Sequence, residues 1–245
     1  MKGALNGAMR QPTIFLLALA PTAMMAQLES DPFLDGLAAV REEQHQQAVT
    51  IFTGVIAQRP DQARAWYYRG ISRDALGDAV GALHDLDRAL LLTPEDHNIR
   101  LKRAEAYIHA ARYDEAATDL QVIIAEEPNH AIGDHARFDL GQVLVAQGDH
   151  EGALVVYNDL VERAPNNAKA YCNRGIVQSK LGAQEAAIAD LSKALLLDPN
   201  LTMAYGSRAI ALIALDRRDE ACQDLVQARD RGDASMEETL VIYCL

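Results

Sequence analysis

A period of 34 residues, lengthened once to 37, runs through most of this chain and limits what it can fold into. Small residues recur at this period, at Gly36, Gly70, Ala104, Gly141, Gly175 and Ala209. Two further columns keep the same intervals, namely Ala48, Ala82, Ala116, Ala153, Ala187 and Ala221, and Phe52, Leu86, Leu120, Tyr157, Leu191 and Leu225. Such a period is typical of stacked supersecondary units, none of which buries its apolar face alone.

The apolar spacing inside each unit is helical. Segments such as AWYYRGISRDAL and ALHDLDRALLL carry apolar residues three and four positions apart, and a turn such as LGD separates them. A proline closes each of the first five units, at Pro60, Pro94, Pro128, Pro165 and Pro199. We therefore predict one helical hairpin per unit, in which the small residue faces the recurrent alanine of the second helix so that the backbones approach closely.

The stretch AWYYRGISRDALGDAVGALHDLDRALLLTP resembles a tetratricopeptide repeat (TPR) in its Trp, Gly, Ala, Leu and Pro positions. Within residues 27–233 the resemblance covers six units, at 29–62, 63–96, 97–130, 134–167, 168–201 and 202–233, and residues 234–245 follow as a capping helix. The second unit alone keeps the tryptophan, Trp66, and the sixth lacks the closing proline. The resemblance implies an all-α, right-handed α-solenoid of six helical hairpins plus the C-terminal capping helix.

Three residues, Ala131, Ile132 and Gly133, are inserted between units three and four. We expect this insertion to alter the superhelix locally, or to mark a joint between two halves of three units each.

The family resemblance also implies a concave groove, lined by the first helix of each unit, that binds a peptide or a partner protein. The groove positions are Phe33, Leu37, Tyr67, Ile71, Asp74, Leu101, Glu105, Phe138, Gln142, Cys172 and Ile176. This surface would favour an apolar helix or an extended peptide with basic flanks. For each residue, packing between units is the alternative role.

Some TPR domains bind a C-terminal carboxylate with Lys, Asn and Arg side chains from consecutive units. Lys169 and Asn173 fit part of that arrangement. The equivalent positions are His135 and Asp139 in unit four, and Met203 and Ser207 in unit six. We therefore do not predict a carboxylate clamp.

An arginine precedes the small residue in four units, and an aspartate stands sixteen residues after each arginine. The pairs are Arg69 with Asp85, Arg103 with Asp119, Arg174 with Asp190 and Arg208 with Asp224. Both partners are missing in unit one, which has Asp35 and Ile51, and in unit four, which has Leu140 and Val156. Because the two columns switch together and centre on the turn, we predict partly buried ion pairs within each hairpin. A ligand-binding row of arginines is the alternative.

Cys222 and Cys244 flank the turn DRGDAS. If residues 234–245 fold back as a capping helix, the two sulfur atoms lie at similar heights on neighbouring helices. We expect a disulfide between them in an oxidising compartment, and two small buried apolar side chains otherwise. Cys172 is expected to pack or to line the groove, since no histidine follows it in the chain to activate a nucleophile.

Residues 1–26 contain only two charges, Lys2 and Arg10, and end in an apolar run that is too short to span a membrane. We expect a secretory signal peptide that is cleaved after Ala26, and hence an exported protein, either periplasmic or secreted. A buried N-terminal helix is the alternative. The later sequence predicts no stable membrane insertion.

The composition argues against several functions. Nucleic acid is not expected as a partner, because 35 acidic residues outnumber 23 basic ones. The seven histidines show no metal-ligand spacing, although His130, Asp134 and His135 gather around the insertion. The sequence carries no phosphate-binding loop or nucleophile elbow. We predict no catalytic residue, no metal and no cofactor.

These observations predict a non-enzymatic, exported TPR scaffold or adaptor that mediates protein–protein interaction through its concave groove. The alternatives are a carrier or chaperone-like component of cell-envelope assembly and a regulatory subunit of an envelope enzyme. The sequence leaves the partner and the oligomeric state open.

Overall fold

The computed structural model describes residues 31–244, and every regular element in this range is a helix. The expected signal peptide lies outside the described residues. The elements are α1 Pro32–Arg41, α2 His45–Gln58, α3 Ala63–Ala75, α4 Ala79–Leu92, α5 His97–His109, α6 Tyr113–Glu126, α7 Ala131–Gln147, α8 His150–Arg163, α9 Ala168–Lys180, α10 Gln184–Leu197, α11 Thr202–Ala214, α12 Arg218–Asp230, the 3₁₀ turn η1 Ala234–Met236 and α13 Glu237–Cys244.

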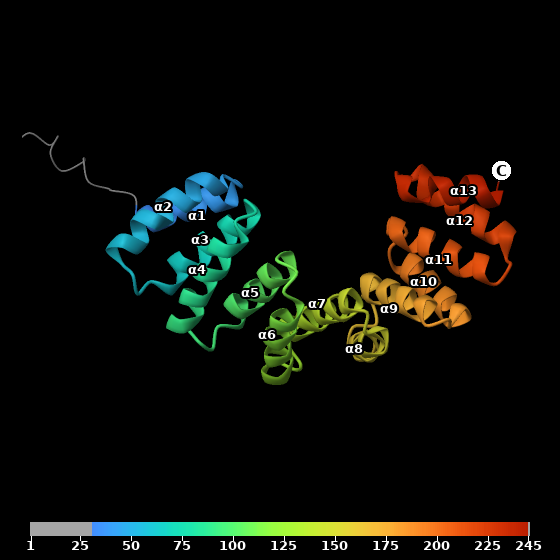
Figure 1. The fold of residues 1–245 in the computed structure, drawn as a ribbon, viewed down its shortest axis with the longest axis horizontal. Coiled ribbons are helices and arrows are strands. Elements are labelled where there is room, and N and C mark those ends of the chain that lie inside the picture. Colours follow the sequence, from blue (N-terminus) through green and yellow to red (C-terminus); the bar gives the residue numbers. More distant parts are fainter. Residues whose placement is uncertain (1–30, 245) are drawn as a thin grey trace, which may run out of the picture.

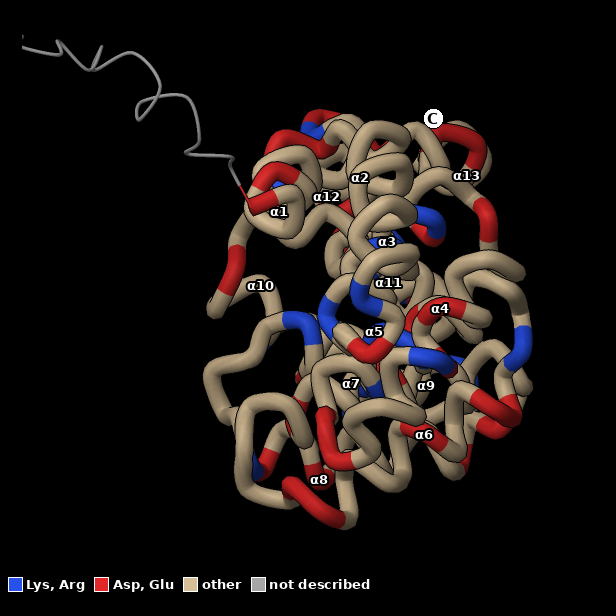
Figure 2. Tube along the Cα trace, turned by 90° about the vertical axis from the view of Figure 1, so that its left-hand side faces the viewer, with Lys and Arg blue, Asp and Glu red and all other residues tan. Residues whose placement is uncertain are grey.

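Consecutive helices pair as hairpins, from α1 with α2 to α11 with α12, and each hairpin packs on the next. Figure 1 shows them following one another along a curved array, with α7 and α8 at its middle. In the view of Figure 2, α1 and α13 both lie at the top and α8 lies at the bottom. The all-helical solenoid predicted from the repeat is therefore confirmed. None of the described helices combines the length and apolar character that crossing a membrane requires.

Short polar side chains begin several of the helices. Asp78 and Asp149 occupy the same place in units two and four, and each accepts a hydrogen bond from the backbone N–H three residues later. Asn167 caps α9 in the same way. These bonds satisfy N–H groups of the first turn that have no partner inside the helix.

The recurrent small residue makes room for a large side chain of the second helix. A Cβ atom at Gly141 would lie 2.4 Å from Cζ of Tyr157, and one at Gly36 would lie 2.6 Å from Cζ of Phe52. The predicted neighbour, the alanine of the second helix, is also close in units two and five, where a Cβ atom at Gly70 or Gly175 would lie 3.3 or 3.1 Å from the carbonyl oxygen of Ala82 or Ala187. Side chains on a helix point back toward its N-terminus, so the ring reaches the small residue while the alanine fills the space beside it.

The insertion lengthens a helix. Ala131, Ile132 and Gly133 form the start of α7, which has 17 residues where α5 and α9 have 13. Gly133 lies against the end of α6, where a Cβ atom would come within 2.0 Å of the Glu127 carbonyl oxygen. Helix α7 therefore starts three residues before the predicted start of unit four at residue 134, and its extra turn packs closely on unit three.

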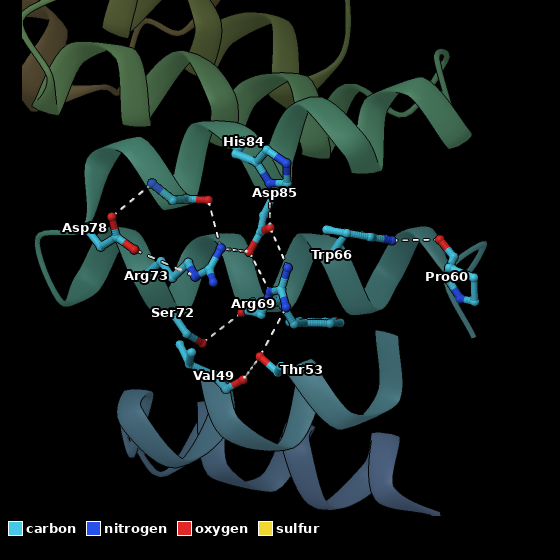
Figure 3. Close-up of polar contacts among 12 residues, drawn as sticks. Val49, Thr53, Pro60, Trp66, Arg69, Ser72, Arg73, Asp78, His84 and Asp85 are labelled. Atoms are coloured by element: carbon cyan, nitrogen blue, oxygen red, sulfur yellow. Dashed lines mark hydrogen bonds and ion pairs between the residues drawn. The ribbon is translucent and has the colours of Figure 1, made fainter. Parts of the chain in front are cut away.

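The arginine of each predicted ion pair binds its aspartate with two hydrogen bonds. Arg69 donates from Nε and Nη2 to the two carboxylate oxygens of Asp85, at 2.7 and 2.8 Å (Figure 3). The distances are 2.6 to 2.8 Å in the other three pairs, Arg103 with Asp119, Arg174 with Asp190 and Arg208 with Asp224. These carboxylates are all buried, so the pairs hold the two helices of each hairpin together.

The third nitrogen of each arginine reaches back into the preceding hairpin. Arg69 Nη1 donates to Thr53 at 3.1 Å (Figure 3). In the other three units the arginine Nη1 atom donates in the same way. Arg103 donates to Asp87 at 2.8 Å, Arg174 to Asn158 at 3.1 Å and Arg208 to Ser192 at 2.9 Å. Each arginine thus also ties one repeat to the next, a role that comparison within single units does not reveal.

Unit four has a different arrangement. Leu140 is buried and Val156 packs against the same apolar cluster, so an apolar pair stands where the other units have arginine and aspartate. Arg137, on the preceding turn of α7, is also buried and donates to Asp159 of α8 at 2.5 Å. The hairpin therefore keeps a cross-helix ion pair, displaced by nearly one turn from the column used elsewhere.

Helix α13 covers the apolar surface of the last hairpin, α11 and α12. Helix α13 packs on α12, and Leu240 is buried with Leu212 and Leu225 in one apolar cluster. Cys222 and Cys244 form a disulfide with a Cα–Cα distance of 5.6 Å. A solenoid needs such a cap to shield the apolar surface of its last unit.

Candidate protein-binding groove

The first helices of the units lie side by side in two runs, one in units one to four and one in units five and six. Helices α1, α3, α5 and α7 contact one another in turn, as do α9 and α11, whereas the second helices make less contact among themselves. This difference places the first helices on the inner, more tightly curved side. Helices α7 and α9 also make less contact than their neighbours, which leaves space between units four and five.

A cavity of about 220 Å³ occupies that space. Its lining residues are Phe138 and Gln142 of α7, Lys169, Cys172 and Asn173 of α9, and Leu201 and Met203 at the start of α11. Pockets for small molecules usually measure about 300 to 1,000 Å³, so this cavity suits one or two side chains of a bound peptide. Its apolar walls can bury an apolar side chain, and one amine and two amides can form hydrogen bonds with it or its backbone. We call this cavity the central pocket.

Three of the predicted groove residues belong to the core. Phe33 packs against Phe52 and Tyr68, while Leu101 and Cys172 lie in the apolar clusters of units three and five. Each is less than a tenth exposed, and Cys172 also lines the central pocket. Most of their surface is therefore already covered by the protein itself.

The other predicted groove residues retain accessible surface. Gln142 is exposed, and the half-buried ones are Leu37, Tyr67, Ile71, Asp74, Glu105, Phe138 and Ile176. Phe138 and Gln142 meet in the central pocket, whereas Leu201 was not predicted there. Leu201 precedes a helix, so no helical periodicity pointed to it.

Tyr67 lines a second cavity, of about 260 Å³, between α3 and α5. Arg64, Asp96 and Asn98 supply polar groups to its wall. Partial burial raises the pKa of Tyr67 to about 12, so its hydroxyl stays protonated at neutral pH and is available as a hydrogen-bond donor.

Polar side chains of α5 and α7 form a cluster of their own. His135 Nε2 lies 3.6 Å from Oδ2 of Asp139, and Glu105 joins them so that one ligand atom of each lies within 4.8 Å of the others. Burial raises the pKa of Asp139 to about 6, since removal from water disfavours its charged form. Lys102 pairs with Glu105 at 2.6 Å.

Of the six positions considered for a carboxylate clamp, all but Ser207 lie in one of these two places. Lys169, Asn173 and Met203 line the central pocket, whereas His135 and Asp139 lie in the cluster with Glu105. Asp134 and His135, which the sequence placed around the insertion, lie within α7. Asp134 instead accepts a hydrogen bond from Arg163 of α8 at 3.0 Å, an ion pair within unit four.

Four tetratricopeptide-repeat family models match the chain, at residues 33–90, 75–134, 141–182 and 168–201. Among curated proteins, Protein FlbA of Caulobacter vibrioides is 29% identical over 64% of this chain and 32% of its own length. The chain spans about a third of the length of the first curated relatives it matches.

Two solved structures have the same fold. The MamA protein superposes with a TM-score of 0.61 and 21% identity, covering 75% of this chain and 96% of MamA. YrrB, described as a TPR protein with an unusual peptide-binding site, gives a TM-score of 0.59 and 20% identity, covering 76% of this chain and 94% of YrrB. The chain is thus an α-solenoid that contains tetratricopeptide repeats.

Proposed function

We propose that this chain is a non-enzymatic, exported scaffold or adaptor that binds a protein partner through the inner groove. The central pocket carries the proposal. It opens where the first helices of units four and five separate, and Phe138, Leu201 and Met203 give it an apolar wall. Lys169 and Asn173 add donors that could bind backbone carbonyls or a carboxylate of a peptide.

The partner's chemistry follows from the groove and from the whole chain. Apolar side chains of a helix or extended peptide would enter the central pocket. The net charge of −12, together with Asp74, Glu105 and Asp139 on the first helices, would attract basic residues flanking that segment.

Export is supported by the disulfide between Cys222 and Cys244. Disulfides persist in oxidising compartments and are rare where thiol reductants are abundant. We therefore propose a periplasmic or secreted location, which fractionation of cells that carry the tagged protein would test.

Site-directed photo-crosslinking tests the binding site. A photoreactive residue at Gln142, which is exposed on α7 and lines the central pocket, should form one discrete adduct in the native cell. The matched control is the same residue at Val155, which is 69% exposed on the second helix of the same unit. We expect no adduct from Val155.

The adduct pattern separates the proposal from its alternatives. Equal adducts from Gln142 and Val155, or none from either, would place binding outside the groove. A broad ladder of masses from Gln142 would favour a chaperone-like carrier of many chains over a scaffold with a defined partner.

A further inference from the structure

Three potential metal ligands converge from two helices on the inner side of the array. Glu105 comes from α5, and His135 and Asp139 come from α7, with one ligand atom of each within 4.8 Å of the others. His135 and Asp139 are four residues apart and therefore share one face of α7. Glu105 lies 30 residues before His135, so only the packing of unit three on unit four brings the set together.

The spacing suits a single small cation. Zn²⁺ binds His nitrogen and carboxylate oxygen at about 2.0 to 2.2 Å, so two ligands of one tetrahedral ion lie about 3.4 Å apart. His135 Nε2 and Asp139 Oδ2 are 3.6 Å apart. Glu105 has a long, half-buried side chain, and because its ligand oxygen is within 4.8 Å of the other two ligand atoms, a movement of at most about 1.4 Å would bring it to the same distance.

Asp139 is the independent sign that a partner is missing. The residue is 8% exposed, yet its Oδ2 atom is buried and accepts no hydrogen bond. His135 Nε2, at 3.6 Å, is too far away to donate one. Buried carboxylate oxygens are normally satisfied, because leaving one unpaired is costly. A cation between Asp139, His135 and Glu105 would satisfy it.

Lys102 is the competing cation at this place. Its Nζ atom lies 2.6 Å from Oε2 of Glu105. A carboxylate has two oxygens, so Glu105 keeps one for a metal while Lys102 holds the other. The Lys102 side chain is 39% exposed, which also lets it swing into solvent when a divalent ion binds.

We propose that Glu105, His135 and Asp139 form a binding site for a divalent transition-metal ion, with Zn²⁺ as the ion best suited to this donor set. One imidazole and two carboxylates supply three ligands, and water would complete the coordination. The site lies outside the central pocket, and its test does not depend on the identity of a protein partner.

Calorimetric titration of Zn²⁺ into the purified, tag-free chain tests the site. We expect one ion per chain, and Co²⁺ in its place should give the absorption bands of a tetrahedral complex. His135→Ala, Asp139→Asn and Glu105→Gln should each weaken binding. Even second-shell partners of metal ligands change affinity by about 10 to 100-fold, so losing a ligand should cost at least about tenfold. Lys102→Gln should instead strengthen binding, because it removes the competing charge.

The matched control is His109→Ala. His109 is exposed on α5 and contacts one carboxylate, Asp74, at 2.8 Å, but belongs to no three-ligand set among the described residues. It should leave the affinity for Zn²⁺ unchanged.

No saturable binding up to about 1 mM Zn²⁺, which corresponds to only about 4 kcal/mol of binding free energy, would overturn the proposal. Equal losses of Zn²⁺ affinity in His109→Ala and His135→Ala would also overturn it. Thermal melts show whether each variant is folded. If Asp139→Asn unfolds the chain, His135→Ala still tests the site, because His135 is exposed and its loss should not affect folding.

Discussion

The guanidinium of Arg174 donates hydrogen bonds to both carboxylate oxygens of Asp190, at 2.6 and 2.8 Å, and a third to Asn158 of the preceding hairpin, at 3.1 Å. The arginine thus joins the two helices of its own repeat and also joins that repeat to the one before it. Its position next to Gly175 suits this role, because the close approach of α9 and α10 brings the two side chains together.

Arg174→Leu should destabilise the protein by about 3 kcal/mol, since it leaves the buried carboxylate of Asp190 without its partner. Adding Asp190→Val should recover much of the loss by copying Leu140 and Val156 of unit four. Urea denaturation of both single variants and the double variant measures the coupling.

Arg229→Ala is the control for that experiment. Arg229 and Asp230 form an ion pair with side chains that are 45% and 52% exposed, so its loss should change stability by less than about 1 kcal/mol. Simple additivity of the Arg174 and Asp190 losses would contradict the pairing.

The repeat itself made much of the fold predictable. Columns of small residues, alanines and arginines recur in register, so each hairpin could be checked against five others. The Arg–Asp pairs were predictable because both members change together. The third hydrogen bond of each arginine, to the preceding hairpin, was not predictable. Its acceptors have in common only a side-chain oxygen and are Thr53, Asp87, Asn158 and Ser192.

The inner surface was less predictable than the hairpins. Phe33 and Tyr67 stand at groove positions of neighbouring first helices, but only packing determines that Phe33 is covered and that Tyr67 lines a cavity. The cluster of Glu105, His135 and Asp139 combines two helices from different units, and no spacing within one helix predicts it. Contacts between units depend on the superhelical geometry, which the period alone does not specify.

Opening the disulfide should release the C-terminal cap. The two cysteines are 22 residues apart, and closing a loop of this size stabilises a protein by about 3 kcal/mol. Cys222→Ser with Cys244→Ser should therefore lower stability by a similar amount and increase amide exchange in α13. Exchange in α1 should stay unchanged, because repeats contact only their neighbours. Unchanged exchange in α13 would show that the non-covalent contacts of the cap, such as Leu240 in its apolar cluster and Arg218 on the Tyr243 carbonyl, are sufficient to hold it.

Cys172 should be inert until the protein unfolds. It is 2% exposed, and burial raises the pKa of its thiol from 9.0 to about 11. At pH 8 only about one chain in a thousand then carries Cys172 as the thiolate, and the surrounding protein shields that thiolate from reagents. A thiol-reactive dye should label no cysteine in the native oxidised chain and one cysteine after denaturation. Rapid native labelling would mean that the central pocket opens to Cys172.

Burial of Cys172 also affects stability at high pH. The folded thiol has the higher pKa, so the unfolded state loses its proton first. The contribution of the thiol is complete below pH 9 and is lost as the pH rises toward 11. Cys172→Ala should flatten the fall in the free energy of unfolding across this range, and an unchanged slope would contradict the raised pKa.

Ala111→Gly should stabilise the third hairpin. Ala111 has a φ of 55°, in the left-handed region, at the turn position that Gly77, Gly148 and Gly182 occupy in other units. A residue with a Cβ atom pays about 1 kcal/mol or more in that conformation, and glycine avoids most of this cost. The reverse change, Gly77→Ala, should destabilise by a similar amount. Thermal melts of the two variants should therefore shift in opposite directions.

Glycine-to-alanine changes at two helical positions should also have opposite effects. In α2, Gly54 is exposed, and a Cβ atom there would meet nothing within 4 Å, so Gly54→Ala should stabilise by about 1 kcal/mol through helix propensity. Gly133→Ala should destabilise, because its Cβ atom would come within 2.0 Å of the Glu127 carbonyl oxygen, a backbone atom that cannot turn away. The joint between units three and four would have to open, and that movement would separate Glu105 from His135. Urea melts measure both effects, and a stabilising Gly133→Ala would mean that α6 and α7 are less closely packed than the structure shows.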